Sequence, residues 1–533
     1  MDASANYGAV INNATRIGGI ASPGNPEDIG ASTLGGSDQN LGNTRGEGTE
    51  STGLIPTGSE NAPGKQKPPI STRMAIFLVV NYMIGSGILN TPQTFRDSGI
   101  AATTVLYILA CLAVWVGSVV LVKAAEEQTN PQSPFSVEEQ VEEGTKGKGE
   151  GGYTAQAKNK YAMIAAEPLG EAGPYIIDSV IAVQNGGAVC SYVIVLGGLA
   201  TSLLSGLLES LQVTPGWWNS FYVVMPVVVF FFVLWPSSWA SFSEIVPLAV
   251  LSLGTISCLL VFVIEKWAFR AEGESLAADL DLDWPLVWWN WNGFFRKVGS
   301  VVFGLTFAPA AFHAYDPMKK RTLSEWKRVV TSSVLVGGAM CYLMGLFGYL
   351  SFGPATEGDI LENFQGGWVA NTLKCCVAGH LVCYIPGEAI VLRDSICGLL
   401  DVDKASLDDK DRQVSTFFIL AAIVGAVILL TAFGLAQGEA FGYILDFTGG
   451  VTASLTSFVL PAFIYLKGSE EQASEGRRGY RLASKILLVF GAALILVVLA
   501  SIFHNPLATV VIFVVVFGGL ILNVSQHTHR KSQ

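Results

Sequence analysis

The chain alternates between long apolar segments and shorter polar ones. Apolar runs of about 20 residues recur about twelve times, and an α-helix needs this length to cross the hydrocarbon core of a bilayer. They lie near residues 75–95, 101–122, 174–204, 220–236, 243–264, 297–315, 328–350, 368–391, 415–435, 441–466, 484–503 and 506–524. The pattern predicts an all-α, multi-pass membrane protein with about 11 or 12 spans.

The first predicted span is interrupted near its centre. The sequence NYMIGSGILNTP, residues 81–92, places Gly85, Ser86 and Gly87 where a helix should be continuous. Unwound backbone survives at membrane depth only where it lines a cavity or binds a ligand, because each unsatisfied backbone group costs several kcal/mol in lipid. The ends of the two half-helices carry opposite partial charges, which suits a zwitterion. The break therefore predicts a binding site for a small charged solute.

The sixth predicted span, near residues 297–315, has small residues and Pro309 at its centre. Its position, five spans after the first break, is typical of a five-plus-five inverted repeat with the substrate between two broken helices. The alternative is that Pro309 only kinks a packed helix, which membrane helices tolerate.

The polar segments set the organisation of the chain. Residues 1–70 are rich in Gly, Ser, Asn and Thr, and they predict a disordered cytosolic tail. Residues 124–160 predict a flexible cytosolic loop, because Lys and Arg gather in alternate loops with the N-terminus inside. The remaining parts are a ten-helix core at 72–466 and one or two further spans at 484–524. Whether the tail is only a solvated extension or a regulatory segment stays open.

Composition argues against other classes of protein. Half of the residues are apolar and only 14% are charged. No HExxH or GxSxG motif occurs, and no His and Cys cluster has metal-ligand spacing. The eight cysteines lie in or beside predicted spans, so no disulfide framework is expected. We therefore expect neither an enzyme nor a metal site or cofactor, and no nucleic-acid partner.

Several motifs together resemble one family. They are the first break, EPLGEAGP at 167–174, Ser191-Tyr192, YLMGLFGYLSFG at 342–353, DILENF at 359–364 and IPGEAIVLRDSI at 385–396. In this order they resemble the amino acid/auxin permeases of the amino acid-polyamine-organocation superfamily. The likeness is strongest to the sodium-coupled neutral amino acid branch and to fungal vacuolar amino acid transporters.

The resemblance implies a leucine-transporter-like fold and an amino acid substrate held by the unwound backbone of the first and sixth spans. One wall, which meets the substrate carboxylate, consists of Gly85, Ser86, Gly87 and Ile88, and the opposite wall consists of Thr306, Phe307, Ala308 and Pro309. Glycine lets backbone approach a ligand closely, and a serine hydroxyl can donate a hydrogen bond to it.

The coupling ion is less clear from the resemblance. Asn81 matches an asparagine near the sodium site of the sodium-coupled branch, and an amide oxygen suits a hard cation. Tyr384, however, stands before Ile385-Pro386 where that branch has a threonine. A proton-coupled or an exchange mode is then supported at least as well as sodium coupling.

Ionisable residues at membrane depth are candidate proton carriers, because their cost there usually reflects a function. They are Asp178, Glu244, His313, His380, Glu388 and Asp446. Four of them have structural alternatives. Glu388 could form an ion pair with Arg393, and His380 could be a hydrogen-bonded interior histidine. Glu244 and Asp446, near span boundaries, could be solvated or cap a helix.

The sequence thus predicts a secondary active transporter of neutral amino acids, driven by proton or sodium symport, in a vacuolar or plasma membrane. The competing interpretation is a membrane amino acid sensor that signals through residues 1–70.

Overall fold

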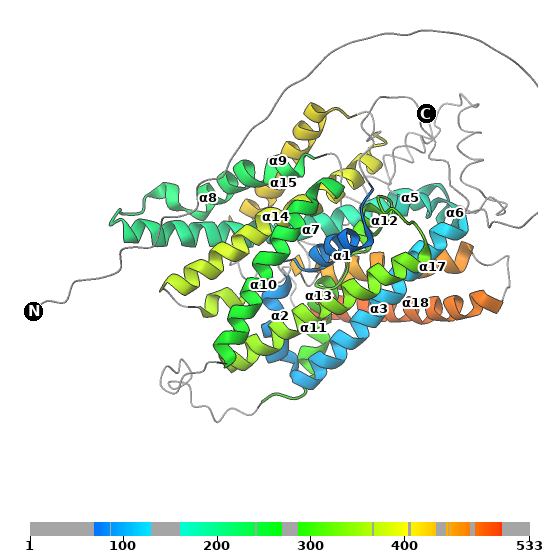
Figure 1. Ribbon diagram of the computed structural model, residues 1–533, viewed down its shortest axis with the longest axis horizontal. Coiled ribbons are helices and arrows are strands. Elements are labelled where there is room, and N and C mark those ends of the chain that lie inside the picture. Colours follow the sequence, from blue (N-terminus) through cyan, green and yellow to red (C-terminus); the bar gives the residue numbers. More distant parts are fainter. Residues whose placement is uncertain are drawn as a thin grey trace, which may run out of the picture. The chain divides into compact units, whose positions relative to one another are not determined.

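The computed structural model describes residues 69–85, 87–128, 160–239, 242–268, 286–364, 367–402, 407–432, 444–445, 447–468 and 475–503 (Figure 1). Within them the regular secondary structure is helical, apart from one short parallel bridge between Ile70 and Met318. Most of the predicted tail, most of the 124–160 loop and the last predicted span at 506–524 lie outside the described residues. Ser86 and Asp446 also lie outside them.

The first half of the bundle contains α1 (Thr72–Met83), α2 (Gly87–Ser98), α3 (Ile100–Gln128), α5 (Lys160–Met163), α6 (Ala166–Leu169), α7 (Gly173–Ser210), α8 (Phe221–Val228), α9 (Leu234–Ser237) and α10 (Val246–Ala268). The second half contains α11 (Trp291–Phe303), α12 (Ala311–Tyr315), α13 (Leu323–Phe352), α14 (Gly367–Leu399), α15 (Asp409–Ala432), α17 (Leu460–Gly468) and α18 (Glu475–Phe503). Two π-helical segments, η8 (Thr448–Ala453) and η9 (Leu455–Val459), lead into α17.

In the described part of the chain, nine helices are long and apolar enough to cross a membrane, and the bent α1–α2 pair makes ten. A shorter apolar helix covers Phe221–Ser237. Each of them coincides with an apolar run of the sequence, which confirms the all-α, multi-pass architecture.

Local sequence signals explain where several helices begin and end. Ser71 caps α1 by accepting a hydrogen bond from the Met74 amide at 3.3 Å, and Thr322 caps α13 in the same way. Gly99 separates α2 from α3 with φ of +90°, a conformation that glycine adopts without strain. A Cβ at Gly99 would also collide with the backbone of Trp288, so the turn between these two helices depends on glycine.

The interior of the bundle is formed by the interrupted spans. The span Trp291–Tyr315, which contains α11 and α12, is 89% buried, whereas α15 and the span on α18 are 28% buried. α1 packs against α10, α12, α13 and α14, and α7 packs along α14 (Figure 1). Because the two interrupted spans are central, unwound backbone in them is shielded from lipid by surrounding helices.

Candidate functional site

The break predicted in the first span is present. α1 ends at Met83, α2 begins at Gly87, and the two helices meet at 57°. At the end of α1 the amide of Ile84 donates to the carbonyl of Val80 at 3.0 Å. The amide of Gly85 then donates to the carbonyl of Met83 at 3.2 Å, which is not a helical bond. The regular ladder therefore stops at residues 84 and 85.

Gly85 is placed where no side chain fits. A Cβ there would lie 2.5 Å from Tyr192 Oη and 3.0 Å from Tyr384 Oη. The first tyrosine belongs to α7 and the second to α14. Glycine at this position therefore lets two buried phenols approach the unwound backbone directly.

The sixth span is also interrupted. α11 ends at Phe303, residues 304–307 are not helical, and Pro309 lies in a short 3-10 turn, η5 (Ala308–Ala310), before α12. The amides of Leu305 and Thr306 both lie near the carbonyl of Val302, at 3.2 and 3.1 Å. The helix is therefore interrupted just before Pro309, in agreement with the expected break.

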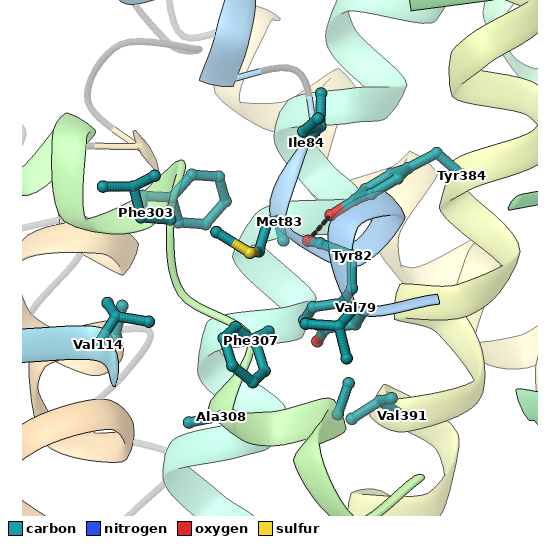
Figure 2. Packing of buried hydrophobic residues seen from close by; sticks show 14 of the residues in the cluster. Val79, Tyr82, Met83, Ile84, Val114, Phe303, Phe307, Ala308, Tyr384 and Val391 are labelled. Atoms are coloured by element: carbon teal, nitrogen blue, oxygen red, sulfur yellow. Dashed lines mark hydrogen bonds between the residues drawn. The ribbon is translucent and has the colours of Figure 1, made fainter. Parts of the chain in front are cut away.

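The two breaks lie against each other. A Cβ built on Gly87 would be 3.5 Å from Phe303 Cδ1 and 3.6 Å from Gly304 Cα. Figure 2 shows Met83 and Ile84 of the first break near Phe303 and Phe307 of the second. The structure thus brings the two predicted walls of the site together.

The predicted substrate residues that the structure describes, all except Ser86, are buried. Gly85, Gly87 and Ile88 belong to the first break, and Thr306, Phe307, Ala308 and Pro309 to the second. The Thr306 hydroxyl contacts the Ser457 hydroxyl of η9, and the Phe307 ring packs edge-on against Trp326 at 6.3 Å between centroids. Their role in binding substrate stays a prediction.

The side chains around the breaks are mainly apolar. Val114 of α3, Met83, Ile84, Phe303 and Phe307 belong to the same buried cluster (Figure 2). Such surroundings favour a ligand whose side chain is uncharged, because burying an unpaired charge is costly. One cluster of polar side chains lies beside these apolar residues.

That adjacent cluster, which we call the Glu388 network, consists of Tyr82, Asn185, Tyr384 and Glu388. Glu388 is 4% exposed, and its Oε2 accepts hydrogen bonds from Tyr82 Oη at 2.9 Å and Asn185 Nδ2 at 2.6 Å. Tyr384 Oη lies 2.7 Å from Glu388 Oε1 and 2.8 Å from the backbone carbonyl of Tyr82. Figure 2 shows this last bond. The network joins α1, α7 and α14 beside the first break.

The other ion-coupling candidates lie outside the network. The Asn81 side chain is buried, and its Oδ1 has no hydrogen-bond partner in the part of the chain that the structure describes. His380 stacks on the Tyr384 ring at 5.5 Å, but its Nδ1 pairs with Ser252 Oγ of α10 at 2.8 Å. Of the named candidates in the described residues, Tyr384 and Glu388 are hydrogen-bonded to each other, whereas His380 contacts Tyr384 through ring stacking.

The expected ion pair between Glu388 and Arg393 is wrong. Arg393 donates to the carbonyls of Ser237 at 3.2 Å and Trp239 at 2.9 Å, and it lies 3.6 Å from the Asp394 carboxylate. Residues five apart point to different sides of a helix, whereas ion pairs along one helix need a separation of three or four.

The remaining ionisable candidates are distributed over the bundle. His313 lies 3.3 Å from the Asp394 carboxylate, Asp178 is fully buried in α7, and Glu244 is partly buried just before α10. None of these three is part of the Glu388 network.

Sequence reasoning missed two members of the network, Tyr82 and Asn185. Neither is charged at neutral pH, so a search for ionisable residues at membrane depth passed over them. The available signal for Asn185 was a carboxamide inside an apolar run; for Tyr82 it was a phenol within the first break motif.

Comparisons with known proteins agree with this geometry. The family model for the transmembrane amino acid transporter protein matches residues 68–504. The chain is 22% identical over 442 residues to the putative sodium-coupled neutral amino acid transporter 11 of Mus musculus, covering 82% of this chain and 86% of the relative. It is 22% identical over 411 residues to vacuolar amino acid transporter 2 of Saccharomyces cerevisiae, covering 74% and 76%.

A solved structure also resembles the chain. It is the crystal structure of a manganese transporter of Eremococcus coleocola in complex with an aromatic bis-isothiourea substituted compound. The TM-score is 0.50 at 12% sequence identity, and the match covers 85% of this chain and 93% of that one. At this identity the likeness concerns the fold alone, and it agrees with the expected leucine-transporter-like architecture.

Proposed function

Because the chain belongs to the family of transmembrane amino acid transporter proteins, we propose that it carries neutral amino acids by proton-coupled alternating access. The family match confirms the resemblance that the motifs indicated. The relatives and the structural neighbour are transporters rather than enzymes. A neutral substrate, a coupling proton and a particular membrane are proposals that go beyond the family match.

The apolar surroundings of the two breaks support a neutral substrate. Met83, Phe303 and Phe307 lie where the amino acid side chain would lie if the breaks hold its charged ends. The amide end of α2, a helix of 12 residues, suits a carboxylate. Burying a charged side chain among these apolar residues is costly.

The position of Tyr384 is the observation that favours a proton over sodium. A sodium ion at this end of α1 would need backbone carbonyl oxygens as ligands. Here the Tyr82 carbonyl accepts a hydrogen bond from Tyr384 Oη at 2.8 Å. The hydroxyl therefore takes the place of a cation and links the carbonyl to Glu388, a group that can carry a proton.

Asn81 is the observation that supports the competing ion. Its buried Oδ1 could act as one ligand of a hard cation. One oxygen is far fewer than the several that such cations require, and the hydroxyl of Tyr384 lies on the carbonyl beside it in the chain.

The expected location is a vacuolar or plasma membrane with the N-terminus in the cytosol. Lys319, Lys320 and Arg321 lie in a loop on the same predicted side as the N-terminus, whereas predicted outside loops 205–219 and 351–367 contain neither Lys nor Arg. The positive-inside rule supports this orientation.

Uptake into proteoliposomes tests the proposal. A labelled mixture of neutral amino acids is offered with an imposed proton gradient in one arm and an imposed sodium gradient in the other. We expect accumulation with the proton gradient alone. Accumulation driven only by sodium would contradict the proton proposal and assign Asn81 to an ion site. Ligand binding without flux in either arm would favour the sensor.

A further inference from the structure

Tyr384 has too few hydrogen atoms for its contacts if Glu388 is ionised. A phenol carries one hydrogen, and a backbone carbonyl can only accept. Tyr384 Oη nevertheless lies 2.8 Å from the Tyr82 carbonyl oxygen and 2.7 Å from Glu388 Oε1. With an ionised carboxylate, one of these two short oxygen contacts would have no hydrogen between the atoms, and its lone pairs would repel each other.

One additional proton, on Glu388 Oε1, gives a hydrogen to both short contacts of Tyr384 Oη. The protonated Oε1 donates to Tyr384 Oη, and Tyr384 donates to the Tyr82 carbonyl. On the other side, Glu388 Oε2 accepts from Tyr82 Oη at 2.9 Å and from Asn185 Nδ2 at 2.6 Å. Asn185 Nδ2 has two hydrogens, and the second reaches Tyr82 Oη at 2.7 Å.

We propose that Glu388 carries the coupling proton, and that this proton decides whether Tyr384 bonds to the Tyr82 carbonyl at the first break. The inference rests on the proposed transport function and specifies its ion site. When the proton leaves Oε1 for water, Tyr384 must donate to the ionised carboxylate, because charge-assisted hydrogen bonds are the stronger ones. The hydrogen bond from Tyr384 of α14 to the Tyr82 carbonyl at the end of α1 is then lost, while Tyr82 Oη still donates to Glu388.

The surroundings of Glu388 contain no competing charge. The titratable groups that face it are Tyr82 of α1 and Tyr384 of its own helix, with Tyr192 of α7 at 3.5 Å from Tyr384 Oη. His380 stacks on Tyr384 but is hydrogen-bonded to Ser252 of α10. Among the described residues no basic side chain lies within ion-pair distance of Glu388. No basic side chain among the described residues therefore takes the place of the proton on Glu388.

The location of the network explains how a proton could couple to transport. Gly85 lies against both Tyr192 and Tyr384, so the same phenols that contact the network also contact the unwound backbone. A change in the Tyr384 hydrogen bond therefore acts directly on the segment that the proposed function assigns to the substrate. The contact between Tyr384 and Gly85 is therefore sufficient to couple the proton to the substrate.

The test compares wild type with Glu388→Gln in proteoliposomes. With one coupled proton, a pH difference of one unit supports at most about tenfold accumulation of a neutral amino acid. We expect wild type to approach this ratio and Glu388→Gln to stay at a ratio of about one, while it still exchanges labelled for unlabelled substrate. Glu209→Gln removes a carboxylate at the exposed end of α7 and serves as the matched control. Proton-driven accumulation by Glu388→Gln would overturn the proposal.

Infrared spectra of the purified protein give a readout that does not depend on transport. A protonated carboxylic acid has a carbonyl band that an ionised carboxylate lacks. We expect such a band near neutral pH in wild type and in Glu209→Gln, and a weaker band in Glu388→Gln, where only other protonated carboxyl groups such as Asp359 remain. An unchanged band in Glu388→Gln would overturn the assignment of the proton. If wild type shows the band but moves no amino acid, the proposed function fails while Glu388 still binds a proton.

Discussion

Gly85→Ala is the substitution whose outcome the structure determines most directly. The added Cβ would lie 2.5 Å from Tyr192 Oη, 2.9 Å from Tyr192 Cζ and 3.0 Å from Tyr384 Oη. The two rings pack edge-on against each other at 5.0 Å between centroids, and His380 stacks on Tyr384 at 5.5 Å, which restrains both rings. The methyl group therefore cannot be accommodated without shifting the break or a ring.

Overpacking of this kind typically costs about 1–3 kcal/mol. A cost of that size reduces the population of the conformation with the Tyr384–Tyr82 bond by about 5- to 150-fold. We expect a lower thermal unfolding midpoint in detergent and at least about fivefold slower uptake.

The matched control is Gly254→Ala in α10, where an added Cβ has no other atom within 4 Å. Alanine favours the helix by about 1 kcal/mol over glycine, so this variant should unfold at the wild-type temperature or higher. If Gly85→Ala behaves like Gly254→Ala in both unfolding and uptake, the close approach of the two phenols to the break does not matter, and our account of the site is wrong.

Three further predictions concern other parts of the molecule. Tyr384→Phe removes the hydroxyl between the Tyr82 carbonyl and the network, so we expect about 1–3 kcal/mol of destabilisation, measured as a lower unfolding midpoint; an unchanged midpoint would contradict the bridging role. The side chain added by Gly87→Leu would reach from a position 3.5 Å from Phe303 into the second break. We therefore expect this variant to insert into the membrane normally but to show no uptake. Normal uptake by the inserted variant would contradict the assignment of the pocket. Burial raises the pKa of Asp359, in the loop between α13 and α14, from 3.8 to about 7, so the folded state favours its protonated form. The contribution of this group to the free energy of unfolding is therefore fully present below pH 3.8 and is lost as the pH rises to about 7. The free energy of unfolding of Asp359→Asn should therefore fall less over this pH range than that of wild type. An equal fall in both proteins would refute the shift.

The sequence by itself determined the architecture and the location of the breaks. Apolar runs long enough to span a bilayer leave few alternatives to a helical bundle, because lipid offers no partners for backbone groups. The same constraint made Gly85 and Gly87 evidence for a binding site, because backbone that is unwound at membrane depth must line a cavity or bind a ligand. Pro309 gave the second break in the same way, and the described helices bear out both.

Only the tertiary structure decided which side chains surround the breaks. Tyr82 and Glu388 are separated by 306 residues along the chain, and Asn185 and Glu388 by 203, yet each pair is hydrogen-bonded. Hydropathy fixes where a residue lies along the membrane normal, but it does not fix the direction in which the residue points around its helix axis. That direction depends on how α1, α7 and α14 pack. This packing places Glu388 within hydrogen-bond distance of Tyr82, Asn185 and Tyr384. It directs Arg393 toward the backbone carbonyls of Ser237 and Trp239 instead.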